Sequence, residues 1–386
     1  MKTVVYVLLL LTTASLALGE NVTCEKNVYP PPSKTGVETL TVDLDLPPEQ
    51  RWVHVVKPKT MQIRRLVDKL KSSLEQYGRD MKLLVDWLEN NVGKLDERLP
   101  QPFAGEIAGI ANATGMTLAE AVLYNIFYEL STFCTSIVAE DSKGELYHAR
   151  NMDFEFGEGY DIKNRTWFLA ENLRPLLVNI NYMRGGNLVF KAAHYAGYVG
   201  VVTGMKPKAF SVSENARSGD GGGGVVGVLE WLLDMKNGTF TGFLTRTTLE
   251  TAETYSDALT MLRSTPLLAP IYYILGGRTS GEGSVITRNK DEAIDVWPMA
   301  SAGGWYILET NYDHWMKPLF LDNRRGPANQ CMRETTQQGV SLPALFNVLS
   351  TKPVLNKGTI YTALMHVESG RLESWIRECD DPCPPF

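Results

Sequence analysis

The chain carries the stretch TFCTSIVAED at residues 132–141 and, after a short gap, YHARNMDF at residues 147–154. From Cys134 onward the first stretch is rich in β-branched and apolar residues, which is typical of a strand, and turn-forming residues follow it up to Gly144. Residues 145–150 favour a second strand. Together they predict a hairpin around which the rest of the chain can be interpreted.

The expected pairing in this hairpin brings reactive side chains together. If the chain turns between residues 142 and 143, residue 134 lies opposite residue 151, and Arg150 and Asp153 stand beside the Cys134 thiol. A nearby positive charge favours the thiolate, so Cys134 is a candidate nucleophile. The alternative is a buried structural cysteine in an ordinary hairpin.

Length and composition predict a globular protein with a sizeable core. The chain has 386 residues, of which 44% are hydrophobic and 21% are charged. The formal net charge is −6 and the sequence contains no prominent basic cluster, which argues against a nucleic-acid-binding protein. The five histidines have no spacing typical of a metal site, so we expect neither a metal nor a cofactor.

Residues 1–19 have the organisation of a secretory signal peptide. Lys2 precedes an apolar run at residues 4–11, and the small residues of the segment 17–19 suit a cleavage site. A membrane anchor is the alternative, although the run is short for a bilayer. Four glycosylation motifs agree with passage through the secretory pathway, at Asn21, Asn112, Asn164 and Asn237.

The pattern of apolar residues changes at Cys134. Before it, spacings of four and three predict one or two amphipathic helices, with a coiled coil as the alternative; the residues are Ile63, Val67, Leu70, Leu74, Tyr77, Met81, Leu84 and Leu88. A second helix is expected at residues 117–130, where Thr117 and Glu120 have capping-box spacing. After Cys134, strands are expected at 136–139, 167–169, 176–180, 188–191, 200–203, 285–286 and 305–310, and helices at 225–234, 249–264 and 342–349. This mixture favours an α+β fold.

The sequence resembles the acid ceramidase family, lysosomal N-terminal-nucleophile amidases related to N-acylethanolamine acid amidase and, more distantly, to bile-salt hydrolases and penicillin V acylases. The resemblance begins with the two stretches quoted above and covers nearly the whole chain after residue 19. It continues through GYVG (197–200), FLTRT (243–247), GEG (281–283), VITR (285–288), TNYD (310–313) and STKPVLNK (350–357). It implies an αββα sandwich with Cys134 at the start of a central strand.

Self-cleavage of the Phe133–Cys134 bond is a further expectation, because it would make Cys134 N-terminal. The chain would then consist of a mainly helical α-subunit, residues 20–133, and a β-subunit with the catalytic core, residues 134–386. The new α-amine, with an ordinary pKa of about 8, could act as a base for its own thiol. This accounts for catalysis without a cysteine–histidine pair.

The resemblance also implies roles for other residues. Asp153 would help to move the proton, Arg150 would orient Asp153 or hold the cysteine backbone and the substrate carbonyl, and Asn311 would donate to the oxyanion. Arg324 and Glu214 match further active-site positions of the family. The sequence after Glu214 departs from the family pattern at residues 216 and 217.

Five cysteines leave one thiol unpaired in an oxidising compartment. If Cys134 is free, the other four allow three pairings. Cys379 and Cys383 are close enough in sequence to pair locally, which leaves Cys24 with Cys331, and the resemblance implies the same pattern.

The expected activity is hydrolysis of ceramide to sphingosine and a fatty acid in the lysosome, with secretion as a further destination. The expected partners are the lipid on internal membranes, a saposin-type activator and anionic lipids, and the two subunits would form a disulfide-linked heterodimer. N-acylethanolamine acid amidase is the alternative enzyme, and a secreted lipid-binding protein is the alternative without catalysis.

Overall fold

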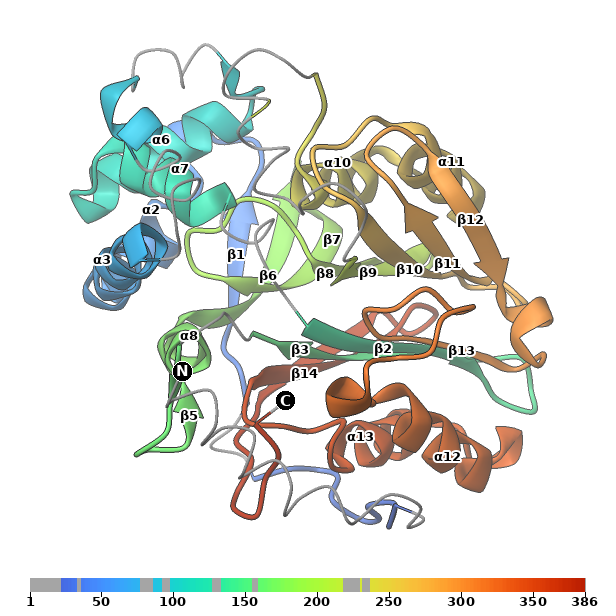
Figure 1. Cartoon of the computed structure of the whole chain (residues 1–386). Coiled ribbons are helices and arrows are strands. Elements are labelled where there is room, and N and C mark those ends of the chain that lie inside the picture. Colours follow the sequence, from blue (N-terminus) through green and yellow to red (C-terminus); the bar gives the residue numbers. More distant parts are fainter. Residues whose placement is uncertain are drawn as a thin grey trace.

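Two β-sheets pack face to face between layers of helices in this computed structural model, which describes residues 22–32, 36–76, 86–91, 98–126, 133–154, 159–217, 230 and 237–385 (Figure 1). This is the expected α+β architecture with αββα layering. Residues 1–21, the expected helix at 225–234 and the end of the one at 117–130 lie wholly or partly outside the described residues.

The larger sheet has eight strands within the described residues, in the order β1-β6-β7-β8-β9-β10-β11-β12. The strands are β1 (Thr39–Asp43), β6 (Leu177–Arg184), β7 (Asn187–Tyr195), β8 (Thr203–Lys206), β9 (Phe210–Ala216), β10 (Ile271–Gly276), β11 (Gly283–Arg288) and β12 (Ala293–Pro298). Helices α10 (Thr241–Thr251) and α11 (Tyr255–Ser264) cover its outer face. They replace the single helix expected at 249–264, because Thr254 and Asp257 form a capping box that starts a new helix.

The smaller sheet has five strands within the described residues, in the order β13-β2-β3-β14-β15. The strands are β13 (Tyr306–Glu309), β2 (Phe133–Glu140), β3 (Leu146–Asp153), β14 (Thr359–His366) and β15 (Arg371–Ile376). Helices α12 (Arg325–Thr335) and α13 (Leu342–Ser350) cover its outer face. Cys134 therefore lies near the start of an interior strand, on the face that meets the larger sheet.

Two expected strands are wrong in part. The apolar run expected as a strand at 167–169 is mostly helix α8 (Phe168–Leu173), which follows the small hairpin of β4 (Tyr160–Asp161) and β5 (Thr166–Trp167). A short apolar run of this kind suits a buried helix as well as a strand. The strand expected at 200–203 begins only at Thr203, as β8.

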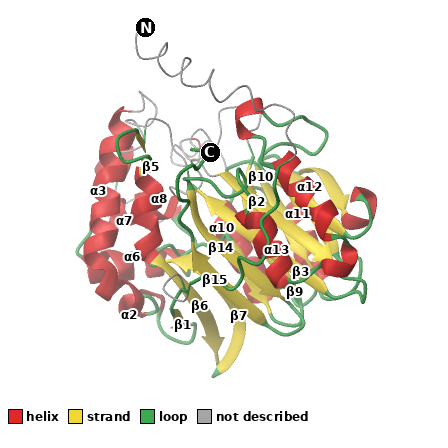
Figure 2. Ribbon diagram, turned by 90° about the horizontal axis from the view of Figure 1, so that it is seen from below, coloured by secondary structure: helices red, strands yellow, loops and turns green. Residues whose placement is uncertain are grey.

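The N-terminal helices form a group at one side of the sandwich (Figure 2). They are α2 (Val53–Val56), α3 (Thr60–Gln76), α6 (Phe103–Thr114) and α7 (Leu118–Ile126). The predicted apolar stripe packs on the main core through Ile63, Val67, Leu70 and Leu88, as the amphipathic interpretation requires; its other side chains lie outside the described set. The capping box of Thr117 and Glu120 is confirmed, with both reciprocal bonds present.

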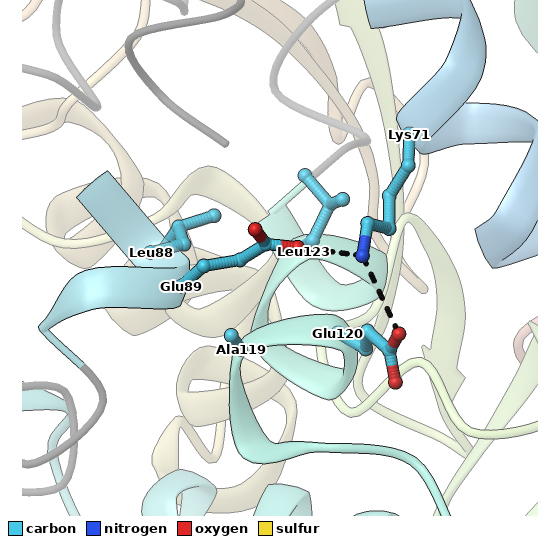
Figure 3. A pocket seen from close by; sticks show the side chains of 6 residues that line it. All are labelled: Lys71, Leu88, Glu89, Ala119, Glu120 and Leu123. Atoms are coloured by element: carbon cyan, nitrogen blue, oxygen red, sulfur yellow. Dashed lines mark ion pairs between the residues drawn. The ribbon is translucent and has the colours of Figure 1, made fainter. Parts of the chain in front are cut away.

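A small pocket lies among these helices (Figure 3). Lys71 of α3 reaches Glu89 at 2.6 Å and Glu120 of α7 at 3.5 Å across it. These ion pairs are partly exposed, so each contributes little to stability. None of the lining residues belongs to the set expected around Cys134.

Several contacts attach the N-terminal segment to the sandwich. Strand β1 pairs in parallel with β6. Cys24 is joined to Cys331 by one of the two expected disulfides, and Cys379–Cys383 is the other; Cys134 is the free cysteine. The fully buried Glu106 of α6 accepts from Arg246 of α10 at 2.6 Å and from Trp52 at 2.7 Å.

Three of the expected glycosylation sites, Asn112, Asn164 and Asn237, are exposed, and Asn21 lies outside the described residues. Within the described ranges, no helix has the length and apolar character needed to cross a membrane.

Candidate active site

The hairpin of β2 and β3 is shifted by one residue from the predicted pairing. Cys134 lies opposite Met152, because the turn is a five-residue loop centred on Lys143. In this loop the Asp141 carboxylate accepts from the backbone of Lys143, and Gly144 has a φ of +87°. The shift places Asp153 opposite Phe133, on the face of the sheet turned away from the thiol. Arg150 lies beside the thiol, and Asp153 is still close enough for its backbone and its charge to act on the pKa of the thiol.

The Cys134 thiol is fully buried. Its sulfur lies 2.5 Å from Nη2 of Arg150 and 3.5 Å from the Met152 sulfur. Burial raises the pKa of the thiol, and the positive charge of Arg150 opposes this effect without overcoming it. In the uncleaved chain Arg150 therefore orients a thiol whose pKa is raised by burial.

Arg150 is held by oxygen atoms of the larger sheet. Its Nη1 donates to the Val202 carbonyl at 3.0 Å and to the Thr203 hydroxyl at 2.8 Å, while Nη2 donates to the Glu214 carbonyl at 3.0 Å. The Thr203 hydroxyl also contacts the hydroxyl of Tyr361, at 2.8 Å. These contacts aim the guanidinium at the sulfur. The sequence offered no signal for Thr203 or Tyr361, since both contacts join distant strands.

The backbone of Cys134 is bound on both sides of its Cα. Its N–H donates to Oδ1 of Asn311 at 2.8 Å, and its carbonyl accepts from Nη1 of Arg324 at 2.7 Å. Nη2 of Arg324 also donates to Oδ1 of Asn311, at 2.8 Å. Because both neighbours can only donate, the amide oxygen of Asn311 must face them. Asn311 and Arg324 therefore hold the nitrogen and the carbonyl of the residue at which the chain is expected to be cut.

The amide nitrogen of Asn311 donates to the Ala216 carbonyl at 2.7 Å. This bond does not exclude donation to an oxyanion, which the resemblance implies, because an amide nitrogen carries two N–H donors, and that role stays a prediction. The geometry of the uncleaved chain supports a second role, in which Asn311 fixes the nitrogen of Cys134.

Arg324 connects the site to two buried carboxylates. It reaches Asp153 at 3.1 Å and Asp322 at 2.6 Å. Burial raises the pKa of Asp153 to about 6, with Arg324 opposing the shift. Asp322 also accepts from the Tyr312 hydroxyl at 2.9 Å, so it orients Arg324. Sequence reasoning missed Asp322, although its position two residues before Arg324 was a usable signal.

Glu214 reaches the site through its backbone, whose carbonyl holds Arg150. Its buried carboxylate accepts from Thr241 at 3.0 Å and from Thr245, both on α10. The described residues contain no cluster of three or more histidine, cysteine or acidic side chains suited to a metal ion.

Comparisons with known protein families match two separate parts of the chain, one before and one from Cys134 onward. Residues 134–375 match the model of the linear amide C–N hydrolases, choloylglycine hydrolase family, and residues 35–99 match the beta subunit of N-acylethanolamine-hydrolyzing acid amidase. The first match begins at Cys134. The two matches therefore divide the chain on either side of the bond between Phe133 and Cys134.

Similar curated proteins include acid ceramidase of Pan troglodytes, 46% identical over 93% of this chain and 92% of that protein, and acid ceramidase of Homo sapiens, with the same identity and coverage. A similar solved structure is the Caenorhabditis elegans N-acylethanolamine-hydrolyzing acid amidase ortholog. It is 30% identical, covers 64% of this chain and 100% of its own, and has a TM-score of 0.52.

Proposed function

The chain belongs to the acid ceramidase family of linear amide C–N hydrolases, and from this premise we propose that it hydrolyses the N-acyl bond of ceramide to sphingosine and a fatty acid. The observation that carries the proposal is the environment of Cys134. Its sulfur, nitrogen and carbonyl are bound by Arg150, Asn311 and Arg324 respectively. The sulfur and the nitrogen take part in N-terminal-nucleophile chemistry, and the bond to the carbonyl helps to hold the residue that carries them.

Maturation is the first step of the proposal. The Cys134 thiol attacks the Phe133 carbonyl carbon, its proton passes to the Cys134 nitrogen, and the C–N bond breaks as a thioester forms. Water then hydrolyses the thioester, which leaves a carboxylate on Phe133 and a free thiol and α-amine on Cys134. The products are residues 20–133 and 134–386, joined by the disulfide between Cys24 and Cys331.

Ceramide hydrolysis then uses the new amine. It takes the thiol proton, the sulfur attacks the amide carbonyl of the lipid, and the ammonium returns the proton to the leaving sphingosine nitrogen. Water releases the fatty acid from the thioester. Burial raises the pKa of Asp153 to about 6, so this carboxyl group can gain or lose a proton at a pH near 6. Arg324 connects Asp153 to Cys134, because it contacts both the Asp153 carboxylate and the Cys134 carbonyl.

The proposed place of action is a lipid surface in the lysosome, where a saposin-type activator or anionic lipids would assist hydrolysis. Large apolar side chains are exposed on one segment between Asn311 and Arg324: Trp315, Met316, Leu319, Phe320 and Leu321. Exposed apolar side chains gathered in this way suit contact with lipid or with an apolar partner. The net charge of −6 becomes less negative in acid, which reduces repulsion from anionic lipids.

Hydrolysis of N-acylethanolamines is the second candidate function. The match of residues 35–99 and the similarity to the C. elegans structure favour it. Both candidates use the same nucleophile and differ in the amine that leaves.

The proposal is tested by following mass and activity together. The purified chain is incubated at about pH 4.5 beside its Cys134→Ala variant, and intact masses are recorded with time. We expect two fragments divided at residue 133 in the first sample and one uncut chain in the second. Cutting of Cys134→Ala at the same bond would assign the cleavage to another protease. Specificity constants for ceramide and palmitoylethanolamide then separate the two functions, since a tenfold preference for the latter would favour the second candidate.

A further inference from the structure

The end of strand β9 binds the segment that carries Asn311 with three consecutive residues. Nδ2 of Asn215 donates to the carbonyls of Glu309 and Thr310, at 3.0 and 2.8 Å. The carbonyl of the next residue, Ala216, accepts from the Asn311 side chain. These contacts join the larger sheet to the point at which the chain leaves β13.

Arg217 continues the series at residue 313. Its Nε and Nη2 donate to the two carboxylate oxygens of Asp313, at 2.7 and 2.9 Å. Tyr272 of β10 donates to the same carboxylate at 2.6 Å. Such a two-bond arginine–carboxylate pair fixes orientation as well as distance. The segment 309–313 is therefore bound at its backbone, at the Asn311 amide and at Asp313.

The contacts close a ring that begins and ends on strand β2. The Ser136 hydroxyl donates to Oδ1 of Asn215 at 2.8 Å, and Ser136 lies two residues after Cys134. From Asn215 the ring passes through the Glu309 and Thr310 carbonyls to Asn311, which accepts from the Cys134 nitrogen. These contacts therefore fix the position of Asn311 relative to strand β2, which carries Cys134.

We propose that Asn215, Arg217 and Asp313 are positioning residues, which set the distance and direction of Asn311 from the Cys134 nitrogen. They touch neither the thiol nor the bond to be cut in the contacts described. The inference rests on the proposed function, because Asn311 matters only if the Cys134 nitrogen takes part in chemistry. It predicts that both self-cleavage and lipid hydrolysis depend on the ion pair of Arg217 and Asp313.

Arg217→Met is the main test, because methionine keeps much of the apolar length of the side chain and removes the two bonds to Asp313. The first measurement is the rate constant for self-cleavage, which does not depend on the amount of protein. The second is kcat for the mature enzyme, divided by the number of Cys134 thiols titrated with a labelled alkylating agent. We expect both to fall by about tenfold with KM changed less than about twofold, since small displacements of a reacting group cost rate rather than binding. Arg217→Lys, which keeps the charge but not the paired bonds, should lose about threefold.

Arg51→Met is the matched control. The Arg51 side chain is 12% exposed and pairs with Glu106, whereas the Arg217 side chain is 11% exposed and pairs with Asp313. We expect the control to change the unfolding midpoint but neither the self-cleavage rate nor kcat per titrated site. Asp313→Asn supplies an independent variant on the other side of the ion pair and should resemble Arg217→Met.

Unchanged kcat per titrated site and an unchanged self-cleavage rate in Arg217→Met and Asp313→Asn would overturn the inference and leave the ion pair with a structural role only. Failure of the proposed function has a different signature, because the unmodified chain would then remain uncut and inactive. If the unmodified chain cuts itself but prefers another amide, self-cleavage alone still tests the positioning residues.

Discussion

Arg150 and Arg246 are both fully buried, yet they serve different neighbours. Arg246 pairs with the carboxylates of Glu106 and Glu250. Burial lowers the pKa of this arginine, but Glu106, Tyr182 and Glu250 together outweigh burial and raise it. Arg150 directs one nitrogen at the Cys134 sulfur and is held by neutral oxygen atoms. The carboxylate pairs of Arg246 join parts of the fold, whereas Arg150 places its positive charge beside the sulfur and also acts on Asp153.

Arg150→Met should have the largest effect on activity. Loss of the positive group beside the sulfur should slow self-cleavage and hydrolysis by about 100-fold to 1,000-fold, as removal of one preorganised donor does elsewhere. Rate constants by mass spectrometry and by lipid assay measure it. A variant that retains more than a tenth of the original rate would show that Arg150 and Arg246 do not differ as proposed.

Arg246→Met should have the largest effect on stability. It leaves Glu106 buried beside Arg51 and Trp52 without its main counter-charge, so we expect a loss of about 3–5 kcal/mol in the free energy of unfolding. Urea titration in a Cys134→Ala background, which keeps the chain uncut, measures this. Adding Glu106→Gln should recover part of the loss because it removes the buried charge. No recovery would mean that packing, rather than charge, connects α6 to α10.

Asp153→Asn should reveal that the catalytic cluster responds to pH. The pKa of Asp153 is about 6 in the folded chain and about 3.8 when unfolded, so the folded state binds the proton more tightly. Its ionisation therefore destabilises the fold above pH 6, and this cost is relieved as the pH falls toward 3.8.

When the pH is lowered from 7.5 to 4.5, the free energy of unfolding of the Cys134→Ala chain should rise by about 2 kcal/mol more than that of the same chain carrying Asp153→Asn. His148 and His194, whose pKa values burial lowers to about 3, act in the opposite direction in acid. The measurement must therefore be the difference between the two chains. A difference that does not vary with pH would contradict the raised pKa.

Removal of the disulfide should have the smallest effect. In Cys24→Ser/Cys331→Ser the cleaved pieces should still elute together and keep activity within about twofold, because β1 remains paired with β6 and Glu106 with Arg246. Native size-exclusion chromatography without reductant measures this. Separation of the pieces would assign their association to the disulfide, and separation only after Arg246→Met is added would assign it to the ion pair.

The hairpin of β2 and β3 was predictable because its signal is local, in the runs of β-branched residues on either side of turn residues. Its pairing was wrong by one residue, since the position of the turn depends on how Asp141 binds the loop. That single shift decided which face Asp153 occupies. The resemblance supplied Asn311, Arg324 and Glu214, which periodicity alone could not have identified.

Strand β9 was missed for a physical reason. Polar residues such as Ser213, Glu214 and Asn215 give β9 the pattern of an exposed segment. In the fold, Ser213 and Asn215 are buried against the smaller sheet and Glu214 is buried against α10, and all three form hydrogen bonds with distant elements. The same holds for Asp322 and Thr203. Hydrophobic patterning cannot reveal a polar layer whose partners are brought together only by the complete fold.

The parallel pairing of β1 with β6 affects whether the cleaved protein can refold. A strand from the first piece forms the edge of a sheet whose other strands belong to the second piece, so after cutting no single polypeptide carries the whole folding pattern. Once the disulfide between Cys24 and Cys331 is also reduced, renaturation would require the two pieces to meet, and each would expose unpaired strand edges until then. We expect the uncut chain to recover from urea far better than the cut and reduced one. The cut and reduced enzyme would therefore persist because it unfolds slowly rather than because it can refold.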